Sequence, residues 1–152
     1  MSTDEPTDFG LLLARAFNAY VGHLHDRLAE AGFDDLRPTF GLPLRALHEA
    51  PRTTTELAAQ LGVTKQAAGK VVGEMERRGL IERVPSPTDG RAVVLRLSPR
   101  GTALVREAVR IGTDVEHDLG ADAARGLRPA LERLAYDPPW EATAHRRARR
   151  VW

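Results

Sequence analysis

The segment Thr53–Leu97 constrains the fold of this chain more than any other, because it combines two short helical patterns, a tight turn and a hairpin pattern. Thr53 and Glu56 have the spacing of a capping box, which opens the first helix. Gly62 ends this helix, and Thr64 is a favourable N-cap for the next one. Two short helices joined by a glycine-containing turn are typical of a helix-turn-helix.

The second of these helices has two different faces when its residues are placed at about 100° per residue. One arc is apolar and is predicted to pack on the core; it holds Ala67, Ala68, Val71, Val72 and Met75. The opposite arc carries both lysines of the chain, an amide, two glycines and an arginine: Lys65, Gln66, Gly69, Lys70, Gly73 and Arg77. Each glycine costs a helix interior about 1 kcal/mol relative to alanine, and close approach to a partner is one compensation. The cationic arc suits the major groove of DNA, although an ordinary amphipathic surface helix has the same pattern.

A hairpin pattern follows the second helix. Leu80–Val84 has the composition of a strand, residues 85–90 are rich in turn-forming residues, and Arg91–Leu97 has the composition of a returning strand. Such a hairpin is the wing of a winged helix. Arg91 follows the tip, where a guanidinium can enter a narrow minor groove, and Asp89 is close enough to hold it. A solvated ion pair between the two, worth less than about 1 kcal/mol, is the alternative.

Several short runs in this region occur in the order and spacing of one type of winged helix: Glu56-Leu57-Ala58, Leu61-Gly62-Val63-Thr64, Lys65-Gln66, Met75-Glu76-Arg77-Arg78-Gly79-Leu80-Ile81, Asp89-Gly90-Arg91 and Leu97-Ser98-Pro99-Arg100-Gly101. On these runs, residues 53–101 resemble the DNA-binding core of the MarR family of bacterial transcription regulators. With its less specific flanks, the resemblance covers residues 8–135. It implies an obligate homodimer whose N- and C-terminal helices interlock. It also implies that the second motif helix enters the major groove and that the wing contacts the backbone or minor groove.

The resemblance and the residue types together predict the contacts with double-stranded DNA. Residues of the second helix and its cap are expected to face bases and phosphates in the major groove, and the wing residues to serve the hairpin. Threonines at the start of the preceding helix are expected to contact phosphates through hydroxyl and backbone N–H groups. A glycine at this surface contributes no side chain, so DNA shape supplements few base contacts. The candidate DNA-binding residues are Thr53, Thr55, Thr64, Lys65, Gln66, Gly69, Lys70, Asp89 and Arg91.

Helices are predicted on both sides of this segment. Apolar residues recur at helical spacing over residues 9–31, in a stripe broad enough to bury against its own domain and a second subunit. A second helix is expected over residues 40–49, with Thr39 as its N-cap. Ser98 and Pro99 should start a long helix, and a last one should cover residues 121–135, kinked or shortened at its beginning by Pro129.

The predicted fold is therefore mainly α with a small β-hairpin wing: a winged helix-turn-helix with N- and C-terminal dimerisation helices. The expected parts are an N-terminal dimerisation helix (1–36), a DNA-binding lobe (37–100), C-terminal dimerisation helices (101–136) and a basic tail (137–152), within one intertwined domain. The tail segment Trp140–Trp152 has three alternatives: a helix packed across the dimer, a basic arm on DNA phosphates, or disorder.

Charge and composition agree with this assignment. The net charge is +1, but residues 52–100 carry +4, against −4 in residues 1–51 and +1 in the remainder. Positive charge therefore concentrates where phosphate neutralisation requires it. The chain has no cysteine, which excludes disulfides and thiol-based redox sensing and makes a reducing cytoplasm the expected setting. No apolar run is long enough for a transmembrane helix.

The sequence thus favours a sequence-specific transcriptional regulator, a repressor rather than an activator, that binds a pseudo-palindromic operator as a homodimer. Its half-sites should lie about one helical turn, or ~10 bp, apart. The resemblance further implies release by a small aromatic or anionic effector, with His23 and Arg45 as possible contacts. The alternative is a winged-helix module that binds a ligand or protein without sequence-specific DNA readout. No enzyme is expected, and no cofactor or metal, because no phosphate loop, paired histidines or catalytic triad can be found.

Overall fold

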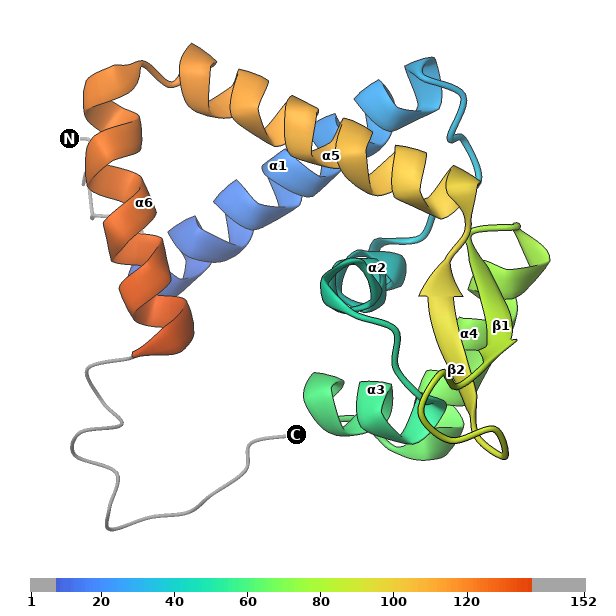
Figure 1. Cartoon of the computed structure of the whole chain (residues 1–152). Coiled ribbons are helices and arrows are strands. Elements are labelled where there is room, and N and C mark those ends of the chain that lie inside the picture. The colour runs from blue at the N-terminus through green and yellow to red at the C-terminus, as the bar shows by residue number, and fades with distance from the viewer. Residues whose placement is uncertain (1–7, 138–152) are drawn as a thin grey trace, which may run out of the picture. The chain divides into compact units, whose positions relative to one another are not determined.

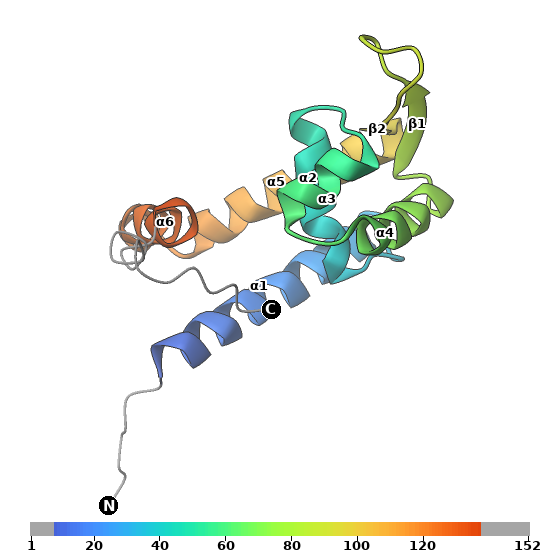
Figure 2. The same ribbon diagram turned by 90° about the horizontal axis from the view of Figure 1, so that it is seen from below.

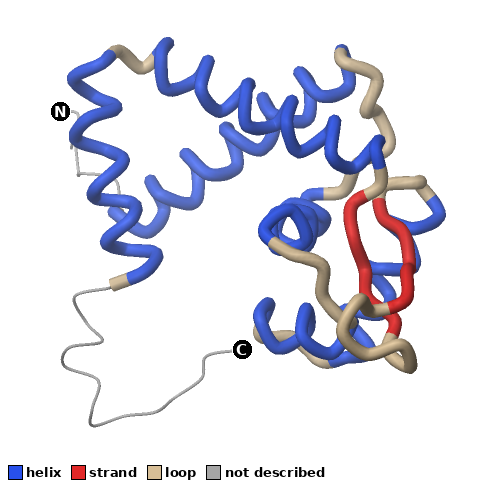
Figure 3. Tube along the Cα trace, viewed as in Figure 1, coloured by secondary structure: helices blue, strands red, loops and turns tan. Residues whose placement is uncertain are grey.

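The computed structural model describes residues 8–137; residues 138–152, most of the predicted basic tail, lie outside the described range. Figures 1 and 3 show a mainly helical chain with one antiparallel hairpin, as the sequence predicted. The elements, in chain order, are α1 (Phe9–Glu30), the 3₁₀ turn η1 (Pro38–Phe40), α2 (Gly41–Glu49), α3 (Thr54–Leu61), α4 (Lys65–Arg77), β1 (Ile81–Pro85), β2 (Val93–Leu97), α5 (Pro99–Asp118) and α6 (Ala121–Tyr136).

The chain divides at Ile111, inside α5, into two compact units. The first unit holds all elements from α1 to the first part of α5. The second holds the end of α5 and α6, which an ion pair between Glu116 and Arg128 joins. None of the described residues from 112 to 137 is buried, so the described part of this unit contains no core. No described helix is long and apolar enough to cross a membrane.

Every element of the first unit contributes buried side chains to its core. Its most deeply buried side chains are Phe40, Leu57, Val72, Met75, Leu80, Leu95 and Ile111. Full burial of such a side chain contributes about 1.5–3 kcal/mol. The segment before α3 is also tied to the hairpin, because the backbone groups of Arg52 and Leu95 exchange hydrogen bonds of 3.1 and 2.7 Å. The helix-turn-helix and the hairpin therefore pack on the same hydrophobic core.

Local signals in the sequence fix most helix ends. Gly32, Gly62 and Gly79 follow α1, α3 and α4 with φ of +87°, +67° and +65°, a left-handed conformation that glycine adopts without strain. The predicted ends of these helices agree with the structure within one residue.

Outside the motif, one prediction is wrong, and one of the two alternative effects predicted for Pro129 is absent. Thr39 does not cap α2; it lies inside η1, and Phe40 occupies the N-cap position without a side-chain cap. The buried ring of Phe40 anchors this turn, so tertiary packing takes the place of a capping hydrogen bond. Pro129 lies inside α6, which nevertheless begins at Ala121 as expected and is not shortened at its start.

The start of α5 lies directly against the turn that follows α4. The Ser98 hydroxyl donates to the Gly79 carbonyl at 2.5 Å and accepts from the Gly101 N–H at 2.9 Å, while the Ser98 N–H donates to the Leu80 carbonyl at 3.0 Å. A Cβ atom on Gly101 would lie only 1.9 Å from the Leu80 carbonyl oxygen. Only glycine fits at this position, because the obstacle is backbone and cannot rotate away.

Substitution Gly101→Ala is therefore expected to lower the free energy of unfolding by about 2 kcal/mol or more. The matched control is Gly126→Ala in α6, where an added Cβ meets no described atom within 4 Å beyond its own helix. That control should gain up to about 1 kcal/mol in helix propensity. Urea denaturation followed by circular dichroism measures both variants, and equal stabilities would contradict the close contact.

Candidate nucleic-acid interface

The N-terminus of α3 is closed by reciprocal hydrogen bonds between Thr53 and Glu56. The Thr53 hydroxyl accepts from the Glu56 N–H at 3.2 Å, and the Glu56 carboxylate accepts from the N–H and the hydroxyl of Thr53 at 2.7 and 2.9 Å. These bonds favour the charged form and lower the pKa of Glu56. Both Thr53 donors expected at phosphate are thus engaged, whereas the exposed Thr55 hydroxyl has no partner among the described residues.

Helix α4 begins at Lys65, with Thr64 as its N-cap. The Thr64 hydroxyl accepts from the Ala67 N–H at 3.1 Å, which leaves the hydroxyl proton able to donate to an outside acceptor. The buried side of α4 is formed by Ala68, Val72 and Met75. Ala67, predicted on the apolar arc, is exposed because only this narrow stripe faces the core.

Opposite the buried stripe, four residues share a single row along α4. We call this set the outer row; at i, i+4, i+7 and i+11, it comprises Gln66, Lys70, Gly73 and Arg77. Gln66, Lys70 and Arg77 are exposed, as is Lys65 at the first helical position. An exposed α-helix of this kind fits the width of the major groove of B-DNA.

The cations of this face are free of ion pairs. Within residues 8–137, the side chains of Lys65, Lys70 and Arg77 have no carboxylate partner, although the helix carries Glu74 and Glu76. Both carboxylates pair with arginines of other segments, with N–O distances of 3.1 Å to Arg37 and Arg83 respectively. The positive charge of this face is therefore available to an external polyanion.

The two glycines of α4 are not required by packing inside the subunit. A Cβ atom at Gly69 would meet no described atom within 4 Å outside its own helix, and one at Gly73 would meet only the Arg77 Nη1 at 3.6 Å, an ordinary contact. Both positions could hold alanine, which a helix prefers by about 1 kcal/mol. The described part of the chain therefore does not explain why α4 has glycine at these two positions.

The hairpin supplies the second part of the surface. Its strands pair from Ile81 opposite Leu97 to Pro85 opposite Val93, and Figure 2 shows the connecting loop projecting beyond the helices of the first unit. The Ser86 N–H donates to the Ala92 carbonyl at 2.8 Å and closes the loop. The wing predicted from the sequence is therefore present as a short, ordered projection.

The contact between Asp89 and Arg91 differs from the predicted ion pair. The Asp89 carboxylate accepts from the backbone N–H of Arg91 at 3.0 Å, the turn that aspartate commonly makes two residues on. Within the described residues, the exposed Arg91 guanidinium has no ion-pair partner. Asp89 therefore shapes the backbone at the tip and leaves the Arg91 side chain free.

Two exposed residues beside this surface were not among the candidates. Arg77 belongs to the outer row, and its helical spacing from Gln66 and Lys70 was a usable signal. Val63, in the turn between α3 and α4, is 45% exposed. The Val63 N–H donates to the Ala58 carbonyl at 3.0 Å. Nothing in the local sequence pattern indicates that its apolar side chain is exposed.

A helix-turn-helix with free cations on its second helix, followed by a projecting hairpin, defines a winged-helix nucleic-acid-binding module. Residues 44–92 match the sequence profile of the MarR family. An HTH-type transcriptional repressor of Mycobacterium tuberculosis is 35% identical over 99 residues, 62% of this chain and 71% of that protein. The multiple antibiotic resistance protein MarR of Salmonella typhimurium is 34% identical over 83 residues, 54% of this chain and 58% of that protein.

Solved structures agree. The transcriptional repressor CouR bound to a 23-mer DNA duplex matches with a TM-score of 0.69 and 26% identity, over 89% of this chain and 98% of that one. A probable transcriptional regulator from Pseudomonas aeruginosa matches with a TM-score of 0.65 and 27% identity, over 84% of this chain and 97% of that one. The chain belongs to the MarR family of transcriptional regulators.

Because the chain itself does not need glycine at position 69, Gly69→Ala should separate folding from binding. The variant is expected to gain about 0.5–1 kcal/mol in the free energy of unfolding. Its affinity for DNA should fall if Gly69 lies at the interface as the sequence predicts, because the added methyl group would then obstruct the approach of the duplex. Gly126→Ala serves as the control: it should gain stability alike and keep its affinity. Unchanged DNA binding by Gly69→Ala, measured by fluorescence anisotropy, would show that the glycine has no role at the interface.

Proposed function

We propose that the protein is a homodimeric repressor that binds a pseudo-palindromic operator, with α4 of each subunit in the major groove and the wing on the neighbouring backbone or minor groove. The observation that carries this proposal is the set of unpaired cations on α4 and the wing: Lys65, Lys70, Arg77 and Arg91. The match to a DNA-bound repressor of the same fold supports it. The family regulates bacterial genes, and a bacterial chromosome lies in the cytoplasm, which we therefore propose as the compartment of this protein.

The chemistry of each side chain suggests its partner. Gln66, near the start of α4, has the amide that can bond adenine at N6 and N7. Lys65 and Lys70 suit phosphates or the acceptor edge of guanine, and the hydroxyls of Thr55 and Thr64 suit phosphate oxygens. Thr53 acts through α3, because its capping bonds hold the helix start in place. Gly69 lets the duplex come close without adding a contact of its own.

The salt dependence of DNA binding tests the wing. Arg91→Ala removes one cation from each subunit and so two from the dimer, which should weaken binding and reduce the slope of log K against log salt by about two. The control Arg106→Ala removes the same charge from an exposed position on α5 and should leave the slope unchanged. The probe is a palindromic duplex that the wild-type protein selects from a random-sequence library. Identical slopes for Arg91→Ala and wild type would mean that the wing does not contact DNA, and failure to select any sequence would favour the alternative module without sequence-specific readout.

Homodimerisation is proposed from the N-terminal half of α1. Phe9, Leu12 and Phe17 are 67%, 55% and 64% exposed, and Leu11, Leu13 and Tyr20 are also exposed. In α6, Leu127 and Leu131 are more than 40% exposed. A contiguous apolar helix face of this kind is unusual on a monomer and typical of an interaction surface. A second copy of the chain is its proposed partner, as the family implies, so that the predicted segments 1–36 and 101–136 serve dimerisation.

Substitution Phe17→Glu should therefore convert the protein to a monomer, because it places a charge in the apolar contact. Sedimentation velocity measures the mass in solution, and binding to the selected duplex should weaken by at least about tenfold, since the two half-sites are no longer linked. Circular dichroism controls for folding, which the substitution should preserve because Phe17 is exposed in the subunit. A dimeric Phe17→Glu protein would place the interface elsewhere.

Effector control remains a proposal that rests on the family alone. His23 and Arg45, named from the sequence, are exposed on α1 and α2. A shallow hollow of about 490 Å³ lies between the hairpin and the start of α5 and includes neither residue. We propose a small aromatic or anionic molecule as the effector, acting by preferring one dimer shape over another.

A further inference from the structure

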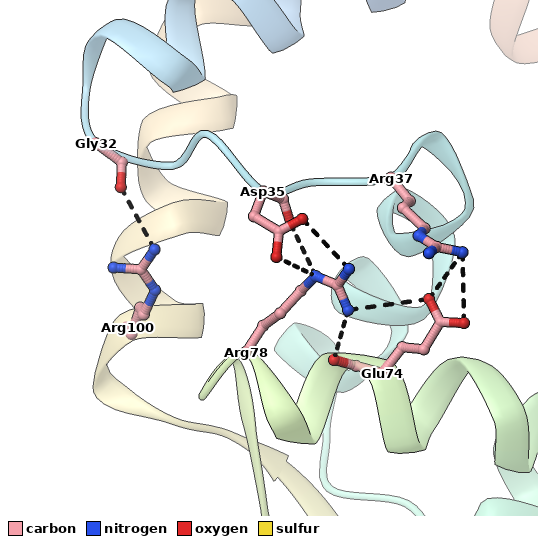
Figure 4. A network of polar contacts seen from close by, with 6 residues as sticks. All are labelled: Gly32, Asp35, Arg37, Glu74, Arg78 and Arg100. Carbon is pink, nitrogen blue, oxygen red and sulfur yellow. Dashed lines mark hydrogen bonds and ion pairs between the residues drawn. The ribbon is translucent and has the colours of Figure 1, made fainter.

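The loop between α1 and η1 is bound to α4 by two arginine–carboxylate pairs. Figure 4 shows Arg78, at the C-cap of α4, reaching across to Asp35, and Arg37 reaching from the loop to Glu74. The Arg78 Nε donates to the Asp35 carbonyl at 2.9 Å and lies 3.0 Å from Asp35 Oδ2, and Arg78 Nη2 donates to Oδ1 at 3.3 Å. The Arg37 Nη1 lies 3.1 Å from Glu74 Oε2.

Arg78 is held on its other sides as well. Its Nη1 donates to the Glu74 carbonyl at 3.1 Å, in the last turn of α4, and its guanidinium lies 5.2 Å from the centre of the Phe40 ring. The side chains of Arg78 and Glu74 are only 19% and 13% exposed. A planar guanidinium that makes several hydrogen bonds and stacks on a ring fixes direction, which a lysine ammonium cannot reproduce.

The hydrogen bonds of Arg78 restrain the position of α4 in a directional way that its apolar core contacts do not. The buried contacts of Ala68, Val72 and Met75 are apolar, and such contacts tolerate small rolls and slides of a helix. The hydrogen bonds of Arg78 fix the end of α4 against a loop that begins directly after α1. Helix α1 carries the apolar face that we assign to the dimer contact. The loop therefore links the position of α4 to the position of the dimer contact.

We propose that Arg78 is a positioning residue that sets the half-site spacing accepted by the dimer. The inference rests on the proposed function. One additional base pair moves a half-site by about 3.4 Å along the duplex and rotates it by roughly a tenth of a helical turn. Two rigidly held α4 helices cannot follow such a change, whereas two loosened helices can.

The chain offers a matched control in Arg100. This residue binds the same loop from α5: its Nη2 donates to the Gly32 carbonyl at 3.4 Å, and its guanidinium lies 5.1 Å from the centre of the Phe33 ring. It thus shares with Arg78 a hydrogen bond to a backbone carbonyl of the loop and a contact with an aromatic ring, but it has no carboxylate partner among the described residues, and none of its described contacts reaches α4. Arg100→Lys should therefore disturb the loop without changing the preferred spacing.

The experiment measures affinity for a series of duplexes that share both half-sites of the sequence selected by the wild-type protein. The spacer between the half-sites is shortened or lengthened by one and two base pairs. Wild type and Arg100→Lys should lose about tenfold or more for each wrong spacing, whereas Arg78→Lys should bind all spacings within about threefold of one another, because the cost of the mismatch is removed. Thermal unfolding of each variant is recorded alongside.

A second variant approaches the link from its other end and keeps the test valid if Arg78→Lys unfolds. Asp35→Ala removes the exposed loop carboxylate but keeps the backbone carbonyl that accepts from Arg78, so it should flatten the spacing profile in the same direction as Arg78→Lys and to a smaller extent. The double variant should then be no flatter than Arg78→Lys alone, since the loss of Arg78 already includes the loss of its contact with the carboxylate. A wild-type spacing profile in Asp35→Ala or in folded Arg78→Lys would overturn the inference while leaving operator binding intact. A wild-type protein that selects no duplex would overturn the inference together with the proposed function.

Discussion

The fold of the first unit depends on one place where two backbones touch. The start of α5 lies against the carbonyl of Leu80, with no room for a side chain at Gly101. The same carbonyl accepts from the Ser98 N–H, and the Ser98 hydroxyl donates to Gly79. The turn after α4, the start of β1 and the start of α5 therefore meet in a close contact that leaves no room for a side chain at Gly101. This contact helps to hold the wing against the end of α4.

Around that corner, the cations divide into two groups with different roles. Those engaged with carboxylates, such as Arg37, Arg78 and Arg83, join α4 to the loop after α1 and to β1. Of those without a carboxylate partner in the described chain, four lie on α4 and at the wing tip, namely Lys65, Lys70, Arg77 and Arg91, whereas others, such as Arg106, lie on other helices. An exposed ion pair adds little to stability, so the arrangement matters chiefly because it keeps the carboxylates Glu74 and Glu76 away from the outer row. A row of positive charge then remains to attract a polyanion.

The sequence was sufficient wherever structure is decided locally. The capping box of Thr53, the Thr64 cap and the glycines that end α3 and α4 act within a few residues, so motif spacing predicted the helices closely. Prediction was wrong where distant packing decides: the buried ring of Phe40, not the Thr39 hydroxyl, sets the start of α2. The link from Arg78 to Asp35 spans 43 residues and leaves no periodic trace. Exposure within α4 was predicted from angle alone, which misplaced Ala67 because the contacting stripe is narrower than the apolar arc.

The free outer row has a consequence for the evolution of this chain. The side chains of Gln66 and Lys70 make no described hydrogen bond or ion pair inside the subunit, so their replacement should cost folding little. Under the function that we propose, specificity can therefore change by single mutations on α4 while Gly101, Ser98 and Arg78 continue to hold the scaffold. A gene duplication of such a regulator starts with a stable fold and needs few changes to acquire a separate set of target genes.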